Sequence, residues 1–119
     1  MHEASIAKGI VNTVENLALK HGFQNFENLK VLIGVGELAG VTFEELEPFL
    51  KRLKPCWVFK SKIIPAICHC SCGFKGKPKV LLKAHDLVVY ECPECGAIPE
   101  LKQGGDVTIL SIRQVSPQA

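Results

Sequence analysis

Two closely spaced pairs of cysteines constrain the fold of this chain more than any other feature of its sequence. The first pair is Cys70-Ser71-Cys72, the second is Cys92-Pro93-Glu94-Cys95, and a glycine directly follows each pair. Two tight turns of this kind can present four sulfurs to one point, which is the tetrahedral geometry of closed structural zinc sites. The sequence therefore predicts a zinc ribbon, with four favoured ligands: Cys70, Cys72, Cys92 and Cys95.

The first half of this site has alternatives, because the segment from Cys68 to Cys72 offers more ligands than one site needs. The spacing Cys70-x-Cys72 is favoured, since a glycine then follows its second sulfur as in the other pair. Cys68 or His69 in place of Cys70 would also give a zinc ligand set, and both alternatives stay open.

The other explanation for six cysteines in 119 residues is a disulfide framework, as in small secreted domains. The start of the chain argues against it, because Met1-His2-Glu3 has an acid where a signal peptide has basic residues. The sequence also has no apolar stretch long enough to span a bilayer. We therefore expect a cytoplasmic protein with reduced, metal-binding thiols and no membrane partner.

The composition indicates a small aliphatic core and little net charge. Hydrophobic residues make up 47% of the chain but aromatic residues only 7%, and Cys56, beside Trp57, is expected to be buried. The formal net charge is +2, and four thiolates around Zn²⁺ would bring it to zero. Such a chain has no global electrostatic reason to bind nucleic acid or a membrane.

The basic residues are nevertheless unevenly distributed. Nine Lys or Arg residues and no acid lie between Lys51 and Lys83. Such a run is typical of a solvated face, but it also suits a docking surface for an acidic protein or a nucleic-acid backbone. A zinc-ribbon nucleic-acid-binding module is therefore the alternative function, although base-stacking aromatics are scarce. We do not expect an enzyme, because the sequence has no Ser/His/Asp grouping and no phosphate-binding glycine loop.

Hydrophobic periodicity predicts an α+β fold with the cysteine module inserted before the last strand. The expected elements are helices over 5–21 and from about 42, and strands over 29–35, 58–68, 79–83, 87–91 and 107–115. Pro48 implies a kink in the second helix or a displaced start, and the last strand changes phase at Ile109 and Leu110, as at a bulge. Residues 1–66 and 105–119 are expected to form an α/β domain with a small three-stranded sheet and two helices. Residues 67–104 are expected to form the zinc-ribbon domain.

The start of the chain has a second possible metal site. The amine of Met1, the amide nitrogen of His2 and its imidazole can close consecutive chelate rings, which places three nitrogens in one plane. Ni²⁺ and Cu²⁺ favour square-planar nitrogen coordination, whereas zinc does not. Glu3, at the positive end of the first helix, helps to offset the repulsion between the helix dipole and a bound cation.

Several motifs together resemble the HypA/HybF family of hydrogenase maturation nickel metallochaperones. They are Met1-His2-Glu3-x-Ser5-Ile6-Ala7, Gly36-Glu37-Leu38, Pro65-Ala66 before Cys-x-Cys-Gly-Phe, and the closing Cys-Pro-x-Cys-Gly. The resemblance covers nearly the whole chain. It implies that His2 binds nickel and that Cys70, Cys72, Cys92 and Cys95 bind zinc. The chain departs from the commoner family pattern in its shortened first pair, in the extra Cys68 and His69, and in Pro48.

The resemblance also implies a function and partners. Family members bind Ni(II) and deliver it for maturation of [NiFe] hydrogenase, and some also assist urease. The implied partners are a nickel-handling, HypB-like GTPase, the hydrogenase large subunit precursor and, in some organisms, urease accessory proteins. We expect the chain to act as a monomer or a weak homodimer, with a zinc ion that is structural because four thiolates leave no open position for water.

Overall fold

The computed structural model describes residues 2–85 and 87–115, and the chain divides into two compact units. The first, here called the helical unit, consists of Met1–Ile33, Phe43–Lys62 and Thr108–Ala119. The second, here called the cysteine unit, consists of Gly34–Thr42 and Ile63–Val107. The α+β class and the inserted cysteine module agree with the sequence prediction. The domain boundaries expected above stay a prediction.

The first helix, α1, spans Glu3–Lys20 and begins slightly before the predicted start. It ends in a Schellman motif at Gly22, whose φ of 79° lies in the left-handed region that glycine tolerates. There the N–H of Phe23 donates to the carbonyl of Ala18 at 2.9 Å. The buried side chains recur at helical spacing along one face, namely Ala7, Ile10, Val11, Val14 and Ala18.

The second helix, α2, spans Phe43–Leu53 and packs against α1 through the fully buried Leu46 and Leu50. Pro48 lies inside this helix on its exposed side, so the start is not displaced towards it. Pro48 has no N–H to donate to the carbonyl of Glu44, which is exposed, so the missing bond does not bury an unpaired group. Neither helix in the described ranges is long and apolar enough to cross a membrane.

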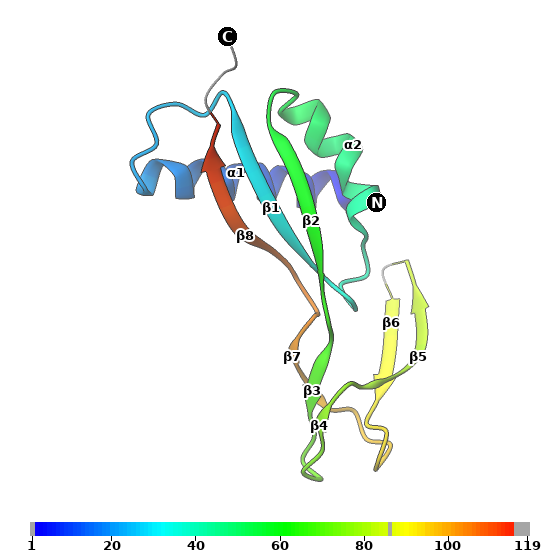
Figure 1. The fold of residues 1–119 in the computed structure, drawn as a ribbon. Helices are drawn as coiled ribbons and strands as arrows, with labels where there is room; N and C mark the ends of the chain where they lie inside the picture. The colour runs from blue at the N-terminus through cyan, green and yellow to red at the C-terminus, as the bar shows by residue number, and fades with distance from the viewer. Residues whose placement is uncertain (1, 86, 116–119) are drawn as a thin grey trace. The chain divides into compact units, whose positions relative to one another are not determined.

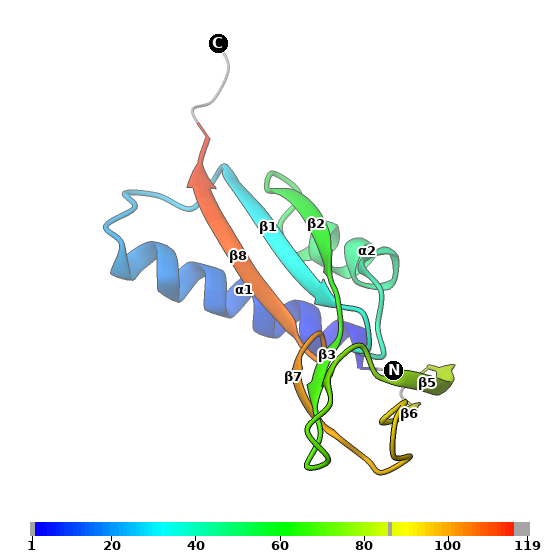
Figure 2. The same ribbon diagram turned by 60° about the horizontal axis from the view of Figure 1, so that its bottom comes forward.

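Both helices lie on the same face of a three-stranded sheet with the order β2-β1-β8 (Figures 1 and 2). Alternate residues of the central strand, Leu29, Val31 and Ile33, are fully buried, as expected for one face packed on helices. The strands span Leu29–Gly36 for β1, Val58–Ile64 for β2 and Val107–Gln114 for β8.

Strands β1 and β8 are antiparallel, and β8 contains the expected bulge. At one end the N–H of Gly36 donates to the carbonyl of Asp106, and at the other the N–H of Val115 donates to the carbonyl of Asn28. The stretch from Asp106 to Val115 is one residue longer than the stretch from Asn28 to Gly36 with which it pairs. One extra residue in one strand is the definition of a β-bulge, and it reverses which side chains of β8 face the helices.

The cysteine unit contains two further small sheets, one with the order β4-β3-β7 and one formed by β5 and β6. The β5–β6 hairpin matches the two short strands predicted between the cysteine pairs. Strands β4 and β7 are too short for a periodic signal and were not expected. The five strands are β3 (Ile67–His69), β4 (Lys75–Gly76), β5 (Lys79–Ala84), β6 (Leu87–Glu91) and β7 (Glu100–Gln103).

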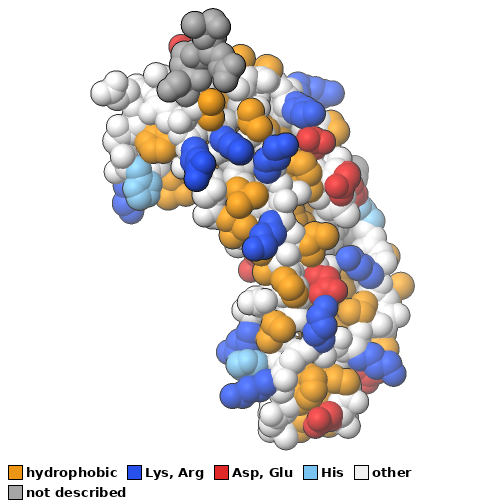
Figure 3. Space-filling view, viewed as in Figure 1, with side chains coloured by type: hydrophobic (Ala, Val, Ile, Leu, Met, Phe, Trp, Pro, Cys, Tyr) orange, Lys and Arg blue, Asp and Glu red, His pale blue; other side chains and the backbone are white. Residues whose placement is uncertain are grey.

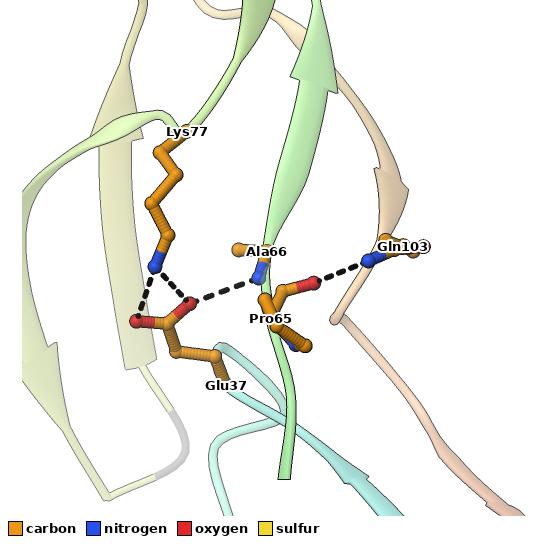
Figure 4. A network of polar contacts seen from close by, with 5 residues as sticks. All are labelled: Glu37, Pro65, Ala66, Lys77 and Gln103. Carbon is orange, nitrogen blue, oxygen red and sulfur yellow. Dashed lines mark hydrogen bonds and ion pairs between the residues drawn. The ribbon is translucent and has the colours of Figure 1, made fainter.

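The single strand expected over 58–68 is wrong, because the chain changes sheet at Pro65 and Ala66. Pro65 has no N–H for a strand ladder. The N–H of Ala66 donates instead to Oε1 of Glu37 at 2.9 Å. Lys77 donates to the same carboxylate at 3.1 Å, and Gln103 donates to the carbonyl of Pro65 at 2.9 Å (Figure 4). These three contacts, here called the Glu37 clamp, fix the break between β2 and β3.

The hydrophobic core of the cysteine unit is small. Among its described residues, the buried apolar side chains are Val35, Leu38, Ala66, Cys68, Cys92 and Pro99. The β5–β6 hairpin leaves most of its leucines and valines exposed, including Val80, Leu81, Leu82, Leu87 and Val89. A module that buries so little apolar surface needs a cross-link or a metal ion for stability.

Candidate metal centre

The structure brings together the four cysteines that the sequence favoured. Cys70 directly follows β3, and Cys92 directly follows β6. The four sulfurs of Cys70, Cys72, Cys92 and Cys95 all lie within 4.8 Å of one another. Cys92 is buried, Cys70 is half-buried, and Cys72 and Cys95 are exposed. The cluster therefore lies at the surface of the cysteine unit with one ligand anchored in its core.

The spacing of the sulfurs fits a zinc ion. Tetrahedral ligands at a Zn–S distance of about 2.3 Å lie about 3.8 Å from one another. The sulfurs of Cys70 and Cys95 are 3.5 Å apart, and those of Cys72 and Cys92 are 3.7 Å apart. An all-thiolate set of this size suits zinc better than a hard cation that prefers oxygen ligands.

A glycine with positive φ closes each cysteine turn. Gly73 has a φ of 99° and Gly96 a φ of 75°, a region that other residues rarely adopt. The N–H of Gly73 donates to the carbonyl of Cys70 and that of Gly96 to the carbonyl of Cys92, both at 2.9 Å. These bonds hold the two sulfurs of each pair on the same side of the backbone.

Backbone N–H groups also point at the sulfurs and stabilise negative charge there. The N–H of Cys72 and the thiol of Cys95 lower the pKa of Cys70 to about 7. The N–H of Phe74 lowers the pKa of Cys72, but desolvation and the other sulfurs outweigh it and raise that pKa to about 12. The Cys70 thiol thus ionises near neutral pH, whereas the Cys72 thiol stays protonated there. Full ionisation of the cluster requires a cation, whose binding would release the remaining protons.

The other candidate ligands of the first pair lie outside this cluster. Cys68 is fully buried within β3, and burial raises the pKa of its thiol. His69 is half-buried on the same strand, where it pairs with Lys75 and Glu100 of the neighbouring strands. In the described residues neither belongs to the group of four sulfurs.

The prediction that Cys56 is buried is wrong. Cys56 is exposed in the turn between α2 and β2. The neighbouring Trp57 is buried instead, and its indole N–H donates to the carbonyl of Phe26. One hydrophobic residue, Trp57, thus anchors the turn, and Cys56 remains in solvent.

The candidate nickel ligand His2 lies at the N-terminal end of α1. It is exposed and occupies the N-cap position, and its carbonyl accepts the N–H of Ile6 at 2.9 Å. The amine of Met1, the other expected ligand, lies outside the described residues.

Sequence reasoning missed a carboxylate near this end of the helix. Glu45, in the first turn of α2, has an oxygen within 4.8 Å of one from Glu3 in the first turn of α1. Apolar residues recur at helical spacing in both helices, which indicates that the two helices pack together. This signal could have placed Glu3 and Glu45 near each other.

The fold and the cysteine cluster together define a small α+β protein with a zinc-ribbon module. Residues 1–114 match the model of the HypA family, described as hydrogenase/urease nickel incorporation, metallochaperone. The chain belongs to the HypA family. The family is one of maturation factors that handle nickel, and its members act in the hydrogenase maturation pathway.

Individual relatives agree with this assignment, and a solved structure has a similar fold. The chain is 30% identical to the hydrogenase maturation factor HypA of Methanocella arvoryzae over 114 residues, which cover 92% of this chain and 94% of that protein. It is 32% identical to HypA of Methanothermobacter thermautotrophicus over 101 residues, covering 81% of each chain. The fold is similar to the solution structure of the Ni metallochaperone HypA from Helicobacter pylori, with a TM-score of 0.68 at 18% identity, covering 98% of this chain and 100% of that one.

Proposed function

We propose that this protein is a nickel metallochaperone that binds Ni(II) at its N-terminus and delivers it for maturation of [NiFe] hydrogenase. The observation that carries the proposal is the match to the nickel-incorporation family over residues 1–114, which includes the exposed imidazole of His2. In this proposal nickel is cargo, and the chain is not a catalyst. The partners are a HypB-like GTPase and the hydrogenase large subunit precursor, with urease accessory proteins as a further destination.

The proposed nickel site at the N-terminus suits a protein that carries and releases nickel, because it has few fixed ligands. The proposed ligands are the amine of Met1, the amide nitrogen of His2 and its imidazole, a set that selects nickel over zinc by geometry. The carboxylates of Glu3 and Glu45 lie near the start of α1, where they offset the positive end of the helix dipole. Protons compete with the metal for the nitrogens, so the bound nickel is expected to leave as the pH falls.

The cysteine cluster has a separate role in this proposal. Cys70, Cys72, Cys92 and Cys95 would hold a zinc ion, which cross-links a unit that has little hydrophobic core. The two glycine turns orient the thiolates, and the backbone N–H groups of Cys72 and Phe74 stabilise their charge. Four thiolates fill the coordination shell, so the site is structural and not open to substrate.

Isothermal titration of Ni²⁺ into zinc-loaded protein tests the nickel site. The wild type should take up one nickel per chain with zinc retained, and His2→Ala should lose this binding. His21→Ala is the matched control, because His21 is an exposed histidine at the opposite end of the same helix and should be dispensable. Unchanged nickel uptake by the His2→Ala protein would contradict the proposed ligand.

A further inference from the structure

The face of the three-stranded sheet opposite the helices carries a group of cations from three separate segments of the chain. On β1, Lys30 alternates with the buried Leu29 and Val31, so it points away from the helices. On β2, Lys60 and Lys62 have the opposite orientation to the buried Phe59. With Arg113 on β8, these exposed residues form what we call the basic sheet face.

The register of the sheet places two of these cations directly opposite each other. Asn28 pairs with Val115 through the hydrogen bond at the end of β1 and β8. In an antiparallel pair, residue numbers rise along one strand as they fall along the other. Two residues after Asn28 and two before Val115, Lys30 therefore lies opposite Arg113. Side chains at such positions are about 4.5–5.5 Å apart at Cβ, and like charges there destabilise a sheet.

The register between β1 and β2 brings the remaining cations to the same face. The N–H of Glu37 donates to the carbonyl of Ile64, so the ends of β1 and β2 coincide and the strands are parallel. Val58 then lies beside Lys30, and Lys60 beside Leu32. Val58 is 44% exposed, so the face combines positive charge with accessible apolar surface. Figure 3 looks onto this face and shows Lys and Arg side chains gathered with hydrophobic side chains between them.

None of the four cations of the basic sheet face forms an ion pair within the described ranges 2–85 and 87–115. Lysines that do form ion pairs lie elsewhere, among them Lys51 with Glu47, Lys54 with Glu15, Lys77 with Glu37, and Lys102 with Glu100. Cations on edge strands commonly prevent sheets from pairing with one another, and this could account for residues on β2 and β8. It does not account for Lys30, because β1 is the central strand.

We propose that the basic sheet face is a docking surface for an extended acidic segment of a partner protein. Lys60 and Lys62 are two positions apart along a strand, a spacing of about 6.6 Å. Carboxylates at alternate positions of an extended chain have the same spacing, so such a segment can pair with both lysines at once. Its carboxylates would also relieve the repulsion between Lys30 and Arg113, and its apolar atoms would cover Val58.

Binding of a short synthetic peptide of alternating glutamate and threonine to the full-length, zinc-loaded, nickel-free protein tests the proposal. Fluorescence anisotropy should show binding that weakens as the salt concentration rises. The double variant K60E/K62E should weaken it by about tenfold or more, since it removes two attractions and adds two repulsions. The matched control K75E/K83E makes the same charge change at exposed lysines in the same basic run of sequence, but in the cysteine unit, and should bind as the wild type does.

A single substitution separates docking from a loss of structure. Lys30→Glu places opposite charges across from each other on β1 and β8, so it should raise the melting temperature while it weakens peptide binding. No peptide binding by the wild type, or equal loss in K60E/K62E and K75E/K83E, would overturn the proposal. Tighter binding of a single-stranded DNA oligonucleotide than of the peptide at the same salt would also overturn it, in favour of a nucleic-acid surface.

Discussion

The helical unit and the cysteine unit differ in what holds them together. In the helical unit, Val14, Leu29, Val31, Leu46 and Leu50 are fully buried between two helices and a sheet. In the cysteine unit, two of the few buried apolar side chains, Cys68 and Cys92, are themselves cysteines, and a whole hairpin exposes its leucines. The difference indicates that the hydrophobic effect stabilises the first unit, whereas the second depends on its sulfur cluster.

The sharpest test of this comparison is removal of one metal ligand. Cys92→Ser should lose zinc and unfold the cysteine unit, because structural zinc is worth about 10–16 kcal/mol in zinc-finger peptides. The helical unit should keep its slow amide hydrogen exchange. Cys56→Ser is the control, since this exposed thiol lies outside the cluster, and it should retain zinc. Equally fast exchange throughout both units of the Cys92→Ser protein would show that they are not independently stabilised.

The converse substitution acts on the helical unit. Leu46→Ala removes a fully buried side chain between α1 and α2, and it should reduce the free energy of unfolding by about 2–5 kcal/mol. Zinc content, measured by metal analysis of the folded protein, should not change. Loss of zinc at temperatures where the variant is still folded would contradict the separation of the two units.

Disturbing a backbone contact inside the cysteine unit should cause a smaller loss of stability. Gly104 has a φ of 89°, and a Cβ there would lie 2.6 Å from the Cα of Ala66. Gly104→Ala should therefore cost about 1–3 kcal/mol through strain and displaced backbone. Hydrogen exchange should rise first around Ala66 and the Glu37 clamp. Gly9→Ala, in α1 with open space around it, should instead be neutral or stabilising.

Substitution of Glu37 in the clamp should cause the smallest loss of stability, and that loss should depend on pH. The N–H of Ala66 and the ammonium of Lys77 lower the pKa of Glu37 below its ordinary value. A carboxyl with a lower pKa in the folded state contributes stability that is present above about pH 4.3 and is lost as the pH falls further. Glu37→Gln should cost about 0.5–1 kcal/mol at pH 7, because the carboxylate is partly exposed. Denaturant unfolding at pH 7 and pH 3 should show the difference between the two proteins disappear at the lower pH.

Glu100→Gln is the matched control for that measurement. Glu100 pairs with Lys102 at 2.9 Å, but its carboxylate is more exposed than that of Glu37, and its pKa is lowered by Lys102 without help from a backbone N–H. Its substitution should change stability less than Glu37→Gln at pH 7. An equal effect of the two would mean that the bond to Ala66 contributes nothing beyond a surface ion pair.

Local signals in the sequence predicted much of this structure. The helical periodicity of α1 and the two cysteine turns, Cys-x-Cys-Gly and Cys-Pro-x-Cys-Gly, depend on residues close together in the chain. The grouping of Cys70 with the second cysteine pair could be anticipated for a different reason, because a glycine follows Cys72 as another follows Cys95. The bulge in β8 was also foreseen, because a change of phase between Ile109 and Leu110 is visible in the sequence itself.

Contacts between distant residues could not be predicted. The break at Pro65 depends on Glu37, and the exposure of Cys56 depends on Trp57 taking the buried position beside Phe26. Strand β4 has two residues, which is too short for periodicity to detect. Lys30 and Arg113 become neighbours only through the register of β1 and β8, so the basic sheet face has no counterpart in the linear charge pattern.

Strand β8 has a consequence for how the protein is made on the ribosome. All four clustered cysteines emerge before Val107–Gln114, the third strand of the sheet beneath α1 and α2. The central strand β1 therefore has unpaired N–H and C=O groups on one side until this last strand has been made. Such an open edge can pair with another chain, so the unfinished sheet is the stage of synthesis most exposed to aggregation.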